Sequence, residues 1–155
     1  MGDPVALRND GGAAPRRSDG PVVLYDGVCG LCNRTVAFVL RRDRRHQFRF
    51  ATLQGTFGAA ALARHGLRTD GDPASIVLLE SPGTPSERAR VRSDAVLAIV
   101  AALGGPWRLV SLLRILPRVL RDAAYELVAR IRYRVFGRFD TCPVPSPTNQ
   151  SQFID

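Results

Sequence analysis

Two cysteines, Cys29 and Cys32, are separated by two residues and stand between an apolar run and a stretch with helical periodicity. The apolar run covers residues 21–25, Pro-Val-Val-Leu-Tyr. A dithiol with this spacing at a helix start is typical of thiol–disulfide exchange, because the helix end lowers the pKa of the first sulfur and the short gap lets the second sulfur reach it. The pair therefore predicts redox chemistry between thiols and disulfides.

The two sulfurs are expected to have different roles. Cys29 falls at or near the N-cap of the predicted helix, where free backbone N–H groups and the positive end of the helix dipole favour a thiolate. Cys32 lies one turn later on the apolar face and is expected to be shielded, which leaves Cys29 to meet a substrate. We therefore predict that Cys29 attacks a disulfide and that Cys32 resolves the mixed disulfide. This chemistry needs no metal or organic cofactor.

Asp26 precedes Cys29 by three residues and is a third candidate catalytic residue. A buried carboxylate with a raised pKa is able to accept the proton of Cys32 during resolution. The structural alternative is an Asp-Gly turn, in which the Asp26 carboxylate bonds backbone N–H groups.

The order of elements predicts the fold class. Apolar and alternating runs predict four strands, at residues 22–26, 47–51, 75–80 and 88–92. Helical periodicity predicts helices at 30–42, 56–65 and 93–103, the last with Ser93 as N-cap, and two more opened by Pro106 and Pro117. The expected inner stripe of the final helix consists of Leu120, Ala124, Leu127 and Ile131. This order predicts an α/β, thioredoxin-like mixed four-stranded sheet flanked by helices, with extra C-terminal helices.

Length and composition predict one domain between two tails. The chain has 155 residues, 45% of them hydrophobic, which is enough for one packed core. Residues 1–20 are rich in Gly, Asp, Arg and Pro and are expected to be a disordered tail. The domain is expected to cover residues 21–142, including the C-terminal helices, and residues 143–155 to form a second tail.

Charge and targeting signals limit the expected kinds of binding partner and the expected cellular compartment. The net charge is +8, and every basic residue is arginine. No nucleic-acid motif accompanies this charge, so nucleic acid is not an expected partner. We find no secretory signal and no apolar run long enough to span a bilayer. These features predict a cytoplasmic protein, in which the dithiol is kept mostly reduced by a thiol electron donor.

The residues around the dithiol resemble a known family. The stretch 24–33, Leu-Tyr-Asp-Gly-Val-Cys-Gly-Leu-Cys-Asn, resembles the signature of the DCC family of predicted thiol–disulfide oxidoreductases, whose Asp, Cys and Cys map onto Asp26, Cys29 and Cys32. The resemblance continues, up to about residue 142, through segments 48–51, 92–95, 104–107, 132–134 and 140–142. It implies a thioredoxin-like fold and protein-disulfide reductase activity but brings no known substrate. The substrate we expect from the dithiol is a disulfide-containing protein or a small-molecule thiol.

One position departs from thioredoxins. They place a cis-proline directly before the third core strand, where it docks the substrate backbone. Here Pro73 stands about two residues early, and Ser75 is expected at that position. General activity toward unfolded polypeptides is therefore not expected.

Other residues offer alternatives. Cys142 is either a third redox thiol or a buried apolar side chain. Arg132, Arg134 and Arg138 with Asp140 either line the site and hold Cys29 anionic or form a solvated basic face. The stretch 107–136 is expected to pack its apolar stripe on the domain, and docking on an anionic membrane surface or on a partner is the alternative.

A second hypothesis comes from a different functional class. The cysteines and one of His46 or His65 would make a four-ligand zinc set. The protein would then be a non-catalytic, redox-sensing or zinc-holding module that binds a partner through its basic helices.

Overall fold

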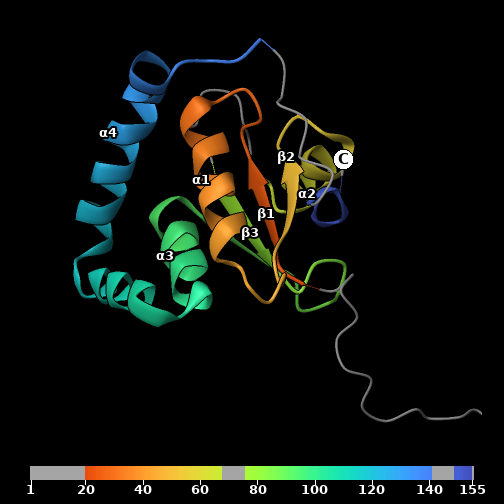
Figure 1. Ribbon diagram of the computed structural model, residues 1–155, viewed down its shortest axis with the longest axis horizontal. Helices are drawn as coiled ribbons and strands as arrows, with labels where there is room; N and C mark the ends of the chain where they lie inside the picture. The colour runs from red at the N-terminus through yellow and green to blue at the C-terminus, as the bar shows by residue number, and fades with distance from the viewer. Residues whose placement is uncertain (1–19, 68–75, 141–148, 155) are drawn as a thin grey trace, which may run out of the picture.

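The computed structural model describes residues 20–67, 76–140 and 149–154 (Figure 1). The strands are β1 (Val22–Tyr25), β2 (Arg49–Thr52), β3 (Ile76–Glu80) and β4 (Arg88–Val91). The helices are α1 (Gly30–Arg42), α2 (Thr56–Arg64), α3 (Arg92–Leu103) and α4 (Arg118–Phe136), with 3-10 helices η2 (Gly105–Ile115) and η3 (Gln150–Gln152).

The four strands form one mixed sheet in the order β2-β1-β3-β4. Strand β1 pairs parallel with β2 and antiparallel with β3, and β3 forms an antiparallel hairpin with β4. All four residues of β1 are buried, because this central strand is covered on both faces, and this explains its continuous apolar sequence. The predicted thioredoxin-like α/β fold is confirmed.

The two faces of the sheet build two separate cores. Helices α1 and α3 cover one face, where Val23, Phe48 and Phe50 pack with Cys32 and Val36. Helix α2 covers the other face. Both cysteines therefore belong to the core under α1, at the end of β1.

Helix α4 lies beside α1 in Figure 1 and packs against α1 and α3. The prediction of its inner face is wrong. The residues predicted to be buried against the domain, Leu120, Ala124, Leu127 and Ile131, are all exposed, although Leu120 and Ala124 border an open pocket between α4 and the rest of the domain. The inner side instead carries Arg121, Tyr125, Ala129 and Arg132. This is a shift of one residue, or about 100° of rotation, because Arg121 pairs with Asp94 of α3 and Arg132 reaches Asp26.

Two local predictions also need correction. The segment opened by Pro106 is a 3-10 helix, η2. The N-cap of α3 is Val91, and Ser93 lies inside the first turn of that helix. The buried hydroxyl of Ser93 donates to Asp122 of α4.

Residues 149–154, which belong to the predicted C-terminal tail, lie against β2, where Ile154 N donates to Phe50 O. None of the helices in the part of the chain described here has the length and apolar character needed to cross a bilayer.

Candidate active site

Cys29 is the N-cap residue of α1, the predicted position. Its backbone is extended (φ −84°, ψ 121°), and its Sγ accepts a hydrogen bond from the Cys32 backbone N at 3.4 Å. The sulfur thus takes the place of the oxygen that usually caps a helix, and it satisfies one of the free N–H groups of the first turn. A negative charge on this sulfur is stabilised by the helix end.

The two thiols have opposite pKa shifts. A hydrogen bond from the Cys32 side chain, with smaller help from backbone N–H groups and the positive charge of Arg132, lowers the pKa of Cys29 to about 6 although burial opposes this. The same hydrogen bond, burial and the charge of Cys29 raise the pKa of Cys32 well above its usual value. Cys29 is therefore the thiolate and Cys32 the protonated thiol at neutral pH.

Asp26 follows β1 and is buried, with 4% of its surface exposed. One carboxylate oxygen, Oδ1, accepts from Val28 N at 3.2 Å and from Gln54 Nε2 at 2.9 Å. The other, Oδ2, accepts from Arg132 and Tyr133 of α4. Asp26 also contributes to the raised pKa of Cys32, so its charge acts on the dithiol. The turn contact of Asp26 with Val28 N is therefore present, and its role in proton transfer stays a prediction.

Helix α4 supplies a cation to this site. Of the arginines considered from sequence, Arg132 is the one that contacts Asp26, with Nη2 at 3.4 Å from Oδ2. Arg134 is exposed on the opposite side of α4, and Arg138 stacks on the Tyr133 ring at 5.6 Å. Burial, with the hydrogen bond to Asp26 next, raises the pKa of Tyr133, which therefore stays protonated and donates. Asp140 is exposed.

Sequence reasoning missed two partners of Asp26. Gln54 donates to the carboxylate and accepts from Gly27 N, so it holds the loop before the dithiol from the end of β2. No local sequence signal marks this glutamine. Tyr133 lies within segment 132–134, which carries part of the family resemblance, and this was the available signal.

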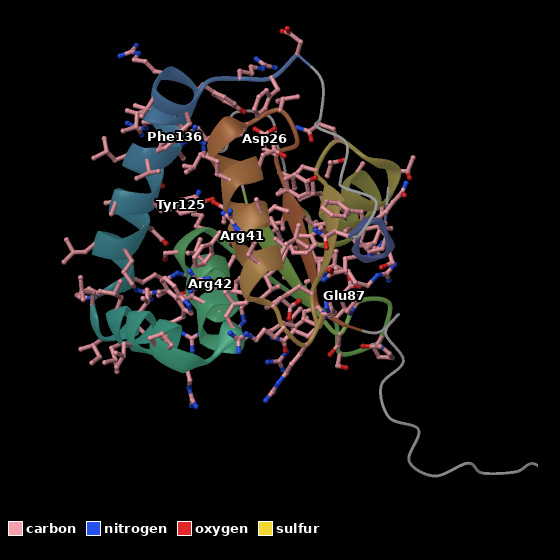
Figure 2. All side chains as sticks on the ribbon, viewed as in Figure 1. Asp26, Arg41, Arg42, Glu87, Tyr125 and Phe136 are labelled. Atoms are coloured by element: carbon pink, nitrogen blue, oxygen red, sulfur yellow. The ribbon has the colours of Figure 1, made fainter. Side chains whose placement is uncertain are left out.

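Both thiols are buried, so the expected difference in exposure is wrong. Cys29 is 0% exposed and Cys32 2% exposed. The chain that leaves α4 crosses the start of α1: Phe139 N donates to Val28 O at 2.8 Å, and Gly30 N donates to Gly137 O at 3.2 Å. Figure 2 shows Asp26 and Phe136 at the same end of α1. The segment 137–139 therefore covers Cys29.

The close approach of this segment depends on the glycine between the cysteines. A Cβ on Gly30 would lie 2.2 Å from the Phe136 carbonyl oxygen, which no side chain tolerates without a shift of α4. Gly30, to which the sequence analysis assigned no role, is therefore the position against which the end of α4 packs.

The zinc hypothesis has no assembled site among the residues with described positions. There, no group of three or more His, Cys, Asp or Glu side chains is arranged to hold a metal. His46 hydrogen-bonds to Gln152, and His65 pairs with Glu87 at 2.7 Å. Cys142, Pro73 and Ser75 lie outside the described residues.

Comparison with known proteins identifies the family. The family model of DCC1-like thiol-disulfide oxidoreductases matches residues 23–138. The uncharacterized protein YuxK of Bacillus subtilis (strain 168) is 36% identical over 133 residues, which cover 86% of this chain and 93% of that protein. The DCC family protein At1g52590, chloroplastic, of Arabidopsis thaliana is 42% identical over 123 residues, 79% of this chain and 68% of that protein. No solved structure matches significantly. The resemblance found from the motifs is thus confirmed, and the chain belongs to the DCC1-like thiol-disulfide oxidoreductase family.

Proposed function

We propose that the protein is a protein-disulfide reductase that acts through Cys29 and Cys32. The observation that carries this proposal is the position of Cys29 at the N-cap of α1, where its Sγ accepts from Cys32 N at 3.4 Å, and the opposite pKa shifts of the two thiols agree with it. With a pKa of about 6, roughly nine-tenths of Cys29 is thiolate at pH 7. A thiolate of this kind is the nucleophile of disulfide exchange.

The reaction has two displacements. The Cys29 thiolate attacks one sulfur of a substrate disulfide, forms a mixed disulfide and releases the other substrate sulfur as a thiolate. Cys32 then gives its proton to Asp26 and attacks the Cys29 sulfur, which releases the second substrate thiolate and leaves a Cys29–Cys32 disulfide. Two electrons pass from the protein to the substrate, and a thiol donor then supplies two electrons that reduce the Cys29–Cys32 disulfide. The chemistry is complete without a metal or organic cofactor, and we place it in the cytoplasm, where thiol systems are reducing.

Access to Cys29 is part of the proposal. Segment 137–139 covers the sulfur and is held there by backbone hydrogen bonds to Val28 and Gly30. A disulfide reaches Cys29 when this segment moves away from the start of α1. Loops that open in this way are common over reactive groups.

Insulin reduction with dithiothreitol as electron source tests the function. We expect the wild-type protein to accelerate the reaction, Cys29→Ser to abolish the acceleration, and Cys32→Ser to abolish turnover while trapping mixed disulfides. Absence of acceleration by folded wild-type protein, with either insulin or a small disulfide, would overturn the proposal.

The burial of Cys29 favours one alternative function, a redox sensor that binds a partner without turnover. In that case, formation of the Cys29–Cys32 disulfide would alter the contact between α1 and segment 137–139 and thereby the exposed side of α4. A protein that forms the disulfide readily but reduces no substrate would support the sensor. Metal analysis of the freshly purified protein tests the zinc-holding form of the same hypothesis.

A further inference from the structure

A pocket of about 420 Å³ opens beside the dithiol, between α1, α3, η2 and α4. This volume lies in the range of small-molecule sites. Its walls are apolar and include Leu31, Val96, Leu97, Leu113, Leu116 and Val128. Figure 2 places Tyr125, another lining residue, between α4 and α1. Cys32 lines the pocket, whereas Cys29 does not.

The cationic side chain of Arg132 borders the pocket and has buried donors that bond no described residue. The Arg132 side chain is 10% exposed and lines the pocket. Its Nη2 donates to Asp26 and Tyr133, but Nε and Nη1 have no hydrogen-bond partner among the described residues. Other polar lining side chains, those of Thr35, Ser93 and Arg121, donate to protein oxygens. Buried donors without partners are rare in native proteins, so Arg132 indicates a ligand with an anionic atom.

The positions of the two sulfurs indicate which of them a ligand in this pocket would contact. Segment 137–139 blocks Cys29, but the pocket leads to Cys32. In the oxidised protein, attack on Cys32 makes Cys29 the leaving group, and the sulfur with the lower pKa leaves faster. An attacking thiolate at Cys32 would also be stabilised by the positive charge of Arg132, which acts on the Cys32 sulfur.

We propose that this pocket binds an apolar dithiol as the electron donor, with its attacking thiolate at Arg132 and its carbon chain against the apolar walls. This inference rests on the proposed function. The donor thiolate attacks Cys32 Sγ, the Cys29–Cys32 bond breaks, and Cys29 leaves as a thiolate. The second thiol of the donor then gives its proton to the Cys32 sulfur and displaces it from the mixed disulfide. The donor ends as a cyclic disulfide, and the protein ends as Cys29 thiolate and Cys32 thiol.

A dithiol is required because the first step is easily reversed. The Cys29 thiolate stays beside the mixed disulfide on Cys32 and is able to expel a donor with a single thiol. A second thiol in the same donor molecule competes as an intramolecular nucleophile and closes the reaction. The reduced protein also restores the Cys29 anion near Arg132, which disfavours a second anion there and helps release.

The test compares two dithiols that share one four-carbon chain and differ by two hydroxyl groups. Butane-1,4-dithiol lacks the two hydroxyls of dithiothreitol, and both form the same six-membered cyclic disulfide. Rates of reduction of the oxidised protein are divided by the rates for 2-hydroxyethyl disulfide, which removes differences in thiolate concentration and intrinsic reactivity. We expect butane-1,4-dithiol to be favoured by about tenfold, because hydroxyls lose water at an apolar wall without gaining partners.

Two neighbouring alanines of α4 supply matched variants. Ala124 lines the pocket and Ala123 does not, and both are exposed, so neither tryptophan substitution enters a packed core. We expect Ala124→Trp to remove the preference for butane-1,4-dithiol and Ala123→Trp to retain it. Acid quenching and tandem mass spectrometry should find the transient donor adduct on Cys32.

The outcomes separate this inference from the proposed function. Equal normalised rates for the two dithiols, equal behaviour of the two variants, or an adduct on Cys29 would each overturn the pocket route while leaving the dithiol mechanism intact. Failure of the wild-type protein to form a Cys29–Cys32 disulfide, or of any thiol to reduce it, would overturn the proposed function itself.

Discussion

The Arg132 guanidinium lies 3.4 Å from the Asp26 carboxylate, and this pair joins α4 to the loop before the dithiol across 106 residues of sequence. Both side chains are almost fully buried, with exposed fractions of 10% and 6%. Loss of one member of a buried pair leaves the other without compensation, which is costly. Arg132 also acts on the sulfurs. Its positive charge lowers the pKa of Cys29, and it partly offsets the larger effects that raise the pKa of Cys32.

Removal of this charge should make Cys29 less acidic. In Arg132→Met we expect the pKa of Cys29 to rise from about 6 by less than about one unit, because Arg132 is one of several causes of the shift. The pH dependence of iodoacetamide alkylation measures this pKa. Arg132→Lys should retain most of the shift, and Arg134→Met, on the exposed side of α4, should leave it unchanged. An equal shift in Arg134→Met would show that Arg132 has no specific effect.

The wild-type pH profile is a separate prediction. Because the pKa of Cys29 is lowered to about 6, most Cys29 is thiolate above pH 7. The thiolate fraction falls as the pH drops through about 6. Alkylation of Cys29 should therefore rise with a midpoint near pH 6, while Cys32 stays unreactive to pH 9. Mass spectrometry of partly alkylated protein checks both thiols. A single midpoint near pH 9 for Cys29 would contradict the thiolate assignment.

Asp26 should matter more for resolution than for attack. Asp26→Asn removes the group that we propose as acceptor of the Cys32 proton, so we expect resolution to slow by about 10²-fold and mixed disulfides to accumulate. Alkylation of Cys29 should change far less. Stopped-flow mixing with a chromogenic disulfide separates the two steps. Asp43→Asn is the control, because Asp43 is also buried but bonds the backbone of Gln47 and Phe48. A purely structural Asp26 predicts the same loss in both variants.

The cover over Cys29 should control its reactivity. Phe139→Pro removes the N–H group that donates to Val28 O at 2.8 Å, so the segment over Cys29 should open more often. We expect alkylation of Cys29 to be several-fold faster than in the wild type. Phe139→Ala keeps the N–H group and provides the control for loss of the side chain. If Phe139→Ala accelerates alkylation as much as Phe139→Pro does, the backbone contact is not the barrier.

The sequence predicted well those features that depend on neighbours within one or two turns. The spacing of Cys29 and Cys32 placed the first sulfur at the N-cap, because three residues span one helical turn whatever surrounds the helix. The strands also lie within two residues of their predicted bounds. Their order was sufficient to predict one mixed four-stranded sheet, since parallel and hairpin connections have few arrangements.

Contacts between distant segments were decided by the tertiary structure. The apolar residues of α4 predicted a stripe that includes Leu127, yet Leu127 is 61% exposed because the ion pairs of Arg121 and Arg132 turn the adjacent side of the helix inward. Hydrophobic spacing alone gives no weight to such pairs.

The sequence by itself determined which two sulfurs stand at the start of α1 and which of them caps the helix, because those effects are local. Only the tertiary structure decided that segment 137–139 covers Cys29, that Cys32 faces an apolar pocket, and that Arg132 completes the site. These features depend on the packing of α4 across α1 and α3, which joins residues about 100 positions apart and leaves no periodic signal in either segment.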